Sequence, residues 1–107
     1  TWPLMCLGAV GVISVVANLC PSLVESLVAA ALEGNHAAGS QYHRKVHDLA
    51  EGIGRFGPNP LPIKTAMAIA GLIEEEFRLP LCPLDSQARA GIECVLRRHE
   101  ILEPKTV

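Results

Sequence analysis

Aromatic residues and clusters of positive charge are scarce in this sequence. Its 107 residues include one Trp, one Tyr and two Phe, and the formal net charge at pH 7 is −2. Proteins that bind nucleic acids present basic patches to the phosphates and aromatic side chains to the bases. Because the chain has neither feature, we expect no nucleic acid among its partners.

Charged residues are missing altogether from the first 24 residues. A stretch of that length is long enough to cross a bilayer. However, Pro3, Gly8, Gly11, Asn18 and Pro21 interrupt it, and no basic residue precedes it as a signal peptide requires. We therefore expect no membrane span and no signal peptide, but a buried segment with flanking turns.

Cysteine pairs of the CxxC type are also missing. Cys6, Cys20, Cys82 and Cys94 lie far apart in a chain that is 50% hydrophobic. This spacing favours buried, reduced thiols over a disulfide framework, and such thiols are typical of cytoplasmic proteins. Only 19% of the residues are charged, so the chain should expose apolar surface to another subunit or to a larger remainder.

A β-branched run near the start predicts a strand over about residues 9–17. Val12, Ile13, Val15 and Val16 disfavour a helix, and the run lacks polar alternation, which indicates a strand covered on both faces. A lone strand has no ladder partner, so we expect this chain to be part of something larger. Without neighbours the segment should rearrange or pair with a second chain.

Most of the remaining chain has apolar residues at helical spacing. We predict helices over about residues 22–33, 37–53 and 63–70, and a last helix capped by Asp85 or Ser86. Gly34 and Gly71 should end two of them, because glycine readily adopts the positive φ of a helix end. The proline-rich stretches 57–62 and 78–84 are expected to be extended connectors.

No group of residues predicts a catalytic centre by itself. His43 and His47 lie one turn apart on a predicted helix, but they lack the glutamate of HExxH and a third ligand, so we expect no metal site. Lys45 should lie on a polar face and Lys105 in the tail. For Lys64, at a helix start, we expect a structural ion pair or cap rather than a Schiff base.

Four segments together resemble the dihydrodipicolinate synthase family of pyruvate-dependent class I aldolases. They are GVISV at residues 11–15, Asn18, GPNPLPIK at residues 57–64, and RLPLCPL at residues 78–84. The resemblance covers nearly the whole chain in the family's order. It implies a mainly α chain that is the carboxyl-terminal fragment of a (β/α)8 TIM barrel. Residues 1–35 would carry the last strand and helix of the barrel, and residues 36–107 the appended helical domain.

The resemblance also implies a reaction. In the family, pyruvate forms a Schiff base with a lysine, and the enamine attacks aspartate semialdehyde on the way to lysine and diaminopimelate. That lysine lies on an earlier strand, so we expect no catalytic residue here and no activity from this chain alone. Ile13 matches the family's isoleucine that lines the pyruvate pocket through its backbone. No cofactor and no metal are implied, and a cytoplasmic homotetramer is expected.

Two alternatives stay open at this point. The chain could be part of another pyruvate-dependent aldolase of the superfamily, acting on a keto-sugar acid or sialic acid. It could also be a non-catalytic helical module that drives oligomerisation. The NPLPIK and RLPLCP segments favour the dihydrodipicolinate synthases over their sialic-acid lyase relatives.

Overall fold

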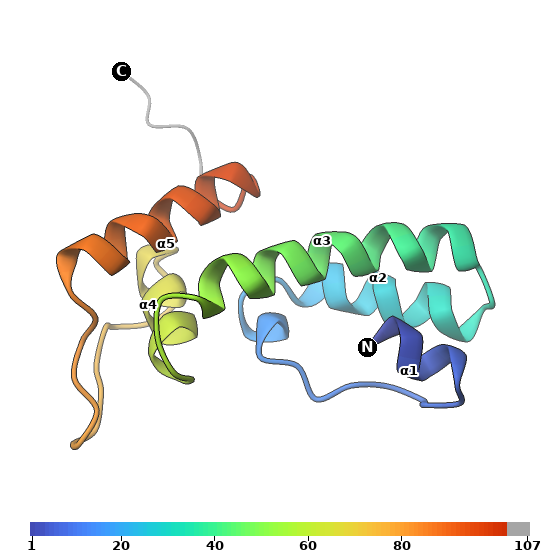
Figure 1. The fold of residues 1–107 in the computed structure, drawn as a ribbon, viewed down its shortest axis with the longest axis horizontal. Coiled ribbons are helices and arrows are strands. Elements are labelled where there is room, and N and C mark those ends of the chain that lie inside the picture. Colours follow the sequence, from blue (N-terminus) through green and yellow to red (C-terminus); the bar gives the residue numbers. More distant parts are fainter. Residues whose placement is uncertain (103–107) are drawn as a thin grey trace. The chain divides into compact units, whose positions relative to one another are not determined.

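A computed structural model describes residues 1–102, and all the regular secondary structure among them is helical (Figure 1). The prediction of a mainly α chain is confirmed, and the predicted helices lie close to the observed ones. In chain order the elements are α1 (Trp2–Cys6), the 3₁₀ helix η1 (Val16–Asn18), α2 (Pro21–Leu32), α3 (His36–Gly54), α4 (Leu61–Ile69) and α5 (Ser86–Arg98).

The strand predicted over about residues 9–17 is not formed, and that prediction is wrong for this structure. Residues 9–14 have no regular secondary structure, and Val16–Asn18 form η1 instead. The hydroxyl of Ser14 accepts a hydrogen bond from the backbone N–H of Ala17 at 3.2 Å, just ahead of this short helix. A strand needs a neighbouring strand for its backbone hydrogen bonds, and residues 1–102 contain none. The β-branched sequence alone does not hold the pleated conformation.

The chain divides into two compact units, Thr1–Asp48 and the part from Leu49 onward, so that α3 contributes residues to both. This division describes contacts within the chain. The predicted boundary after residue 35 refers to the barrel of the family, and it stays a prediction.

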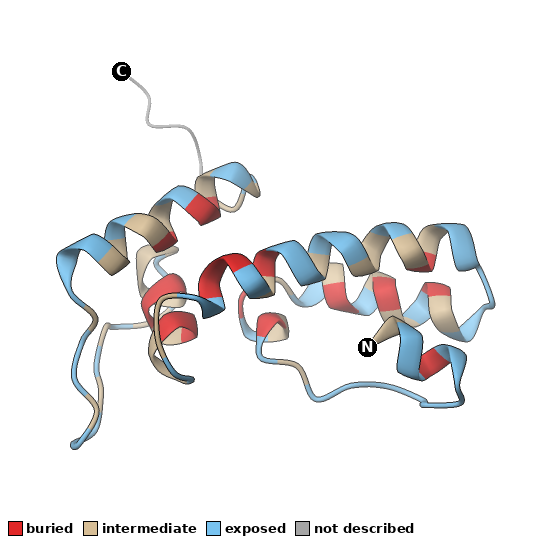
Figure 2. Ribbon diagram, in the orientation of Figure 1, coloured by how far each residue is buried: buried red, intermediate tan, exposed pale blue. Residues whose placement is uncertain are grey.

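In the first unit, α1 and η1 both pack against α2. Leu27 of α2 is fully buried, and Met5 of α1 and Val16 of η1 belong to the same unit's core (Figure 2). The connection to α3 uses Gly34 at φ +71°, as the sequence predicts. Asn35 then caps α3, since its Oδ1 accepts a hydrogen bond from the N–H of Ala38 at 3.1 Å.

In the second unit, α4 and α5 pack against each other. Ile92 and Leu96 on α5 and Ala66 on α4 have no exposed surface. The predicted cap of the last helix is confirmed, because Asp85 Oδ1 accepts a hydrogen bond from the N–H of Ala88 at 2.8 Å. These contacts give α4 and α5 a shared apolar core and a defined start for α5.

Among the described residues, none of the helices combines the length and the apolar character needed to cross a membrane.

Candidate functional site

The segment that the family resemblance marks as pocket-lining lies between α1 and η1. Ile13, the predicted pyruvate-lining residue, is fully exposed at 105% of its reference area, and Val10 is 84% exposed. Gly11 has no atom within 4 Å of the place where a Cβ would lie. Residues 10–13 are therefore exposed to solvent, whereas Ser14 is half-buried (Figure 2).

The backbone of the same segment is also without partners. The N–H of Ala9 donates to the carbonyl of Leu4 at 3.0 Å, but within residues 1–102 the N–H groups of residues 10–14 donate to nothing. Exposed apolar side chains flank these free backbone groups, namely Leu4, Leu7, Val10, Val12, Ile13 and Val15. Free backbone donors beside β-branched side chains are what an additional strand pairs with.

Lys45 and Lys64 are the lysines that lie within the described residues. Lys64 donates a hydrogen bond from Nζ to the backbone carbonyl of Glu76, and the same atom lies 5.1 Å from the centroid of the Phe77 ring. Its amine thus ties the start of α4 to the connector that follows. Lys45 is exposed on α3, as predicted. The prediction for Lys105 lies outside the described residues.

Three histidines and the only tryptophan gather in the first unit. The rings of His43 and His47 stack with their centroids 5.9 Å apart and an interplanar angle of 27°. The indole of Trp2 lies 6.2 Å from the His43 ring and 6.3 Å from the His36 ring. Within residues 1–102 there is no group of three or more His, Cys, Asp or Glu side chains that could hold a metal ion.

His43 titrates in an altered environment. Loss of solvent lowers the pKa of its imidazole most, followed by the positive charge of the amino terminus and then by His47. The neutral ring is therefore favoured at pH 7.

The four cysteines are free, but the expectation that they are buried is wrong for three of them. Cys6, Cys82 and Cys94 are exposed, and Cys20 is half-buried. Burial raises the pKa of the Cys20 thiol. Cys6 lies on α1 and Cys94 on α5, and the sequence does not fix which face of each helix they occupy.

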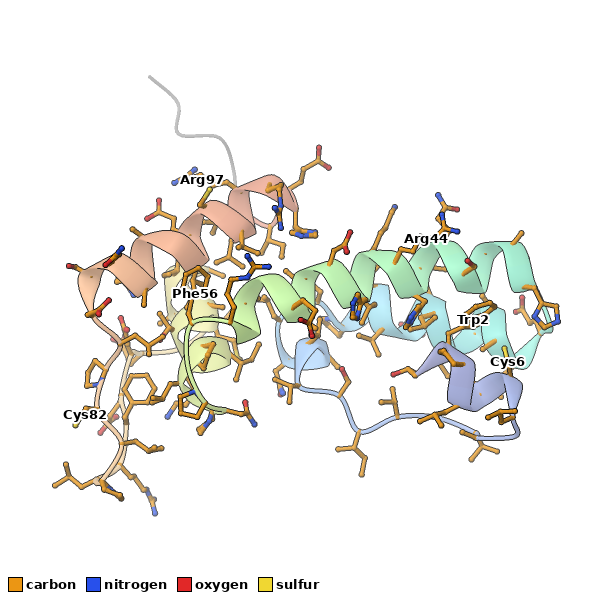
Figure 3. The ribbon with its side chains drawn as sticks, in the orientation of Figure 1. Trp2, Cys6, Arg44, Phe56, Cys82 and Arg97 are labelled. Carbon is orange, nitrogen blue, oxygen red and sulfur yellow. The ribbon has the colours of Figure 1, made fainter. Side chains whose placement is uncertain are left out.

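The sequence gives no signal for the position of Trp2. Its indole lies against α3 at Gly39, where a Cβ would come within 2.8 Å of the Trp2 Cδ1 atom (Figure 3). A single glycine in a predicted helix interior often marks a close approach of this kind. Nothing in the sequence pairs it with residue 2.

A model described as the dihydrodipicolinate synthetase family matches residues 1–99, and the chain belongs to this family. Relatives named 4-hydroxy-tetrahydrodipicolinate synthase include one from Aquifex aeolicus, which is 40% identical over 94% of this chain and 34% of its own length. One from Campylobacter jejuni subsp. jejuni is 42% identical over the same shares. The chain therefore spans about a third of the length of the curated relatives it matches.

Solved structures give the same picture. The dihydrodipicolinate synthase from Aquifex aeolicus matches with a TM-score of 0.88 and 40% identity, over 94% of this chain and 34% of that chain. The 4-hydroxy-tetrahydrodipicolinate synthase from Methylacidiphilum fumariolicum SolV matches with a TM-score of 0.85 and 40% identity, over 94% of this chain and 33% of that chain. The predicted resemblance is confirmed, and the match is consistent with the carboxyl-terminal part of these synthases.

Proposed function

We propose that this chain serves as the carboxyl-terminal part of a 4-hydroxy-tetrahydrodipicolinate synthase. The full enzyme would be a lyase that condenses pyruvate with aspartate semialdehyde through a Schiff base, in lysine and diaminopimelate biosynthesis. The observation that carries this proposal is a single continuous match. Synthases bearing that name align with 94% of the chain at about 40% identity, and one of their structures superposes with a TM-score of 0.88.

Ile13 is the residue of this chain that we propose to line the pyruvate pocket, through its backbone. Residues 10–14 have free backbone N–H groups, and Val10, Val12 and Ile13 are exposed, so a neighbouring strand could pair with this backbone without breaking a hydrogen bond donated by these N–H groups. Active sites of barrels lie at the carboxyl ends of the strands, where the last strand would place Ile13. Gly11 has open space around it and leaves room for such an approach.

The amine that attacks pyruvate is proposed to come from outside this chain. Imine formation needs a free, unprotonated amine in a desolvated pocket. Lys64 is hydrogen-bonded to the Glu76 carbonyl, and Lys45 lies exposed on α3. We therefore propose that the isolated chain forms no imine and has no lyase activity.

The proposed enzyme is a cytoplasmic homo-oligomer that needs no cofactor. Exposed apolar side chains in the first unit support an assembly, since surface of this kind is commonly covered by another subunit or by the rest of the protein. Among similar structures, one from Acinetobacter baumannii is described as complexed with pyruvate, and another as the first monomeric dihydrodipicolinate synthase variant.

A chimera tests the proposal. In the Aquifex aeolicus synthase, the segment that this chain matches is replaced by residues 1–107, and condensation of pyruvate with aspartate semialdehyde is assayed. We expect activity, and Ile13→Val should leave the KM for pyruvate unchanged because the proposed contact is made by the backbone. Gly11→Val should raise that KM by removing the space for close approach.

The same two variants in the isolated chain are the matched control. Both positions are open to solvent, so we expect no change in the free energy of unfolding. A chimera that folds and assembles but shows no activity with these substrates would contradict the proposal. That result would favour the helical oligomerisation module instead.

A further inference from the structure

His43 and His47 are a pair of imidazoles that the proposed lyase activity leaves unused. They lie one helical turn apart on α3, with ring centroids 5.9 Å apart and planes inclined by 27°. Within residues 1–102, neither ring takes part in a hydrogen bond or an ion pair. His47 is exposed and His43 half-buried, so solvent and ions reach the space beside the pair.

The sequence alone predicts no metal site at these histidines, because a third ligand is missing. From the observed closeness of the two rings we infer instead that His43 and His47 chelate a divalent transition-metal ion, of the class that prefers imidazole ligands. Two histidines at positions i and i+4 share a helix face and can bind one ion. Metal–nitrogen bonds of about 2.0–2.1 Å in a tetrahedral site place two imidazole centroids about 5 Å apart. The observed separation is within about 1 Å of that distance, which small side-chain rotations can supply without moving the helix.

A metal ion binds the neutral form of an imidazole. On α3 itself, Arg44 and Lys45 add positive charge nearby and Asp48 adds negative charge.

With His43 and His47 as its two protein ligands, the site would be open and would exchange its metal ion readily. The described residues offer no third His, Cys, Asp or Glu to complete a closed site, so water fills the remaining positions. Affinity should then follow the general order for nitrogen ligands, with Cu²⁺ strongest and Ni²⁺ and Zn²⁺ weaker. The inference concerns an exchangeable surface site, and it does not depend on the proposed lyase function.

Trp2 supplies a direct readout, because it is the only tryptophan of the chain and its ring lies 6.2 Å from His43. Cu²⁺ bound at the pair should quench its fluorescence. The titration uses an untagged full chain carrying a short N-terminal extension, so that the α-amino group cannot act as a ligand beside His43. The exposed thiols of Cys6, Cys82 and Cys94 are alkylated beforehand, because free thiols bind and reduce Cu²⁺. We then expect saturable quenching with one ion per chain, reversed by a chelator, while circular dichroism stays unchanged.

Two variants distinguish binding at His43 and His47 from binding at the nearby His36. His47→Ala changes an exposed side chain and should weaken Cu²⁺ binding by about tenfold or more, because one of two ligands is lost. His36→Ala is the matched control, since His36 lies 6.3 Å from Trp2 but outside the pair, and it should leave the dissociation constant unchanged. Equal affinity in His47→Ala, or equal weakening by His36→Ala, would overturn the inference. Direct measurement of Ni²⁺ binding by calorimetry gives the same comparison without fluorescence.

Discussion

The indole of Trp2 occupies the space in which a side chain on Gly39 would lie. A Cβ built on Gly39 falls 2.8 Å from Trp2 Cδ1, closer than real Cβ atoms approach another atom, and 3.2 Å from Cε2, which is a tight contact. Gly39 is one of the buried residues of α3, and Trp2 begins α1. The glycine thus allows the short first helix to lie close to α3 within the first unit.

Gly39→Ala should therefore destabilise the first unit. Alanine favours a helix over glycine by roughly 0.5–1 kcal/mol, but overpacking against a rigid indole costs about 1–3 kcal/mol. We expect a net loss of free energy of unfolding and a red shift of Trp2 emission. The control is Gly54→Ala on the same helix. A Cβ built on Gly54 meets no atom of another part of the chain within 4 Å, so the free energy of unfolding should be unchanged or raised. Equal stability of the two variants would show that the indole does not need the glycine.

Phe56 and Gly91 form a similar pair in the second unit. A Cβ on Gly91 would collide with the Cε1 and Cζ atoms of the Phe56 ring. We expect Gly91→Ala to lower the free energy of unfolding by about 1–3 kcal/mol in urea titrations. The double variant with Phe56→Leu should lose less than the sum of the two single variants, because the shorter side chain makes room. Strict additivity would mean that the two residues are not in contact.

The four cysteines should differ in their reactivity. Burial raises the pKa of the Cys20 thiol and also covers it in part, so less thiolate is available for alkylation. We expect iodoacetamide at pH 8 to label Cys6, Cys82 and Cys94 first and Cys20 last, as peptide mass spectrometry at several times would record. In urea, which unfolds the chain, the four thiols should be alkylated at similar rates. Cys20 reacting as fast as the others in the native chain would contradict its placement.

Stability should fall as the solution is made acidic, in part because of His43. Its pKa is lower in the folded chain than the ordinary value of about 6.5. Below pH 6.5 the unfolded chain then binds more protons at this residue than the folded chain does. The contribution of His43 to the free energy of unfolding is therefore complete above pH 6.5. It is lost as the pH falls through the lowered pKa that His43 has in the folded chain.

Chemical unfolding between pH 7.5 and 5, with a chelator present, measures this effect. His43→Gln should reduce the slope of unfolding free energy against pH, whereas His36→Gln serves as a control on the same cluster. A slope that is unchanged in His43→Gln would assign the pH dependence to other groups.

The sequence predicts the helices well because their signals are local. Asp85 caps α5 as expected, and Gly34 adopts a positive φ just after α2. Both effects depend only on residues a few positions away in the sequence. The histidine pair on α3 likewise follows from helical spacing alone. In each case the information needed lies within one or two turns.

The strand over residues 9–17 and the position of Trp2 could not be predicted in the same way. Val12 and Ile13 favour a pleated backbone, but that conformation depends on hydrogen bonds from a partner strand that residues 1–102 do not supply. The approach of Trp2 to Gly39 depends on how α1 packs in three dimensions, and no spacing rule links the two positions. The exposure of Cys6, Cys82 and Cys94 could not be predicted either, because packing rather than composition decides whether an apolar residue is buried.

The central claim is that this chain contributes a pocket segment to a pyruvate lyase whose reactive amine lies elsewhere. The most direct measurement is trapping with pyruvate and borohydride, followed by peptide mapping, on both the isolated chain and the Aquifex aeolicus chimera. We expect no adduct on the isolated chain, and one pyruvyl adduct on the chimera at a lysine outside residues 1–107. An adduct on Lys45, Lys64 or Lys105 in either protein would contradict it.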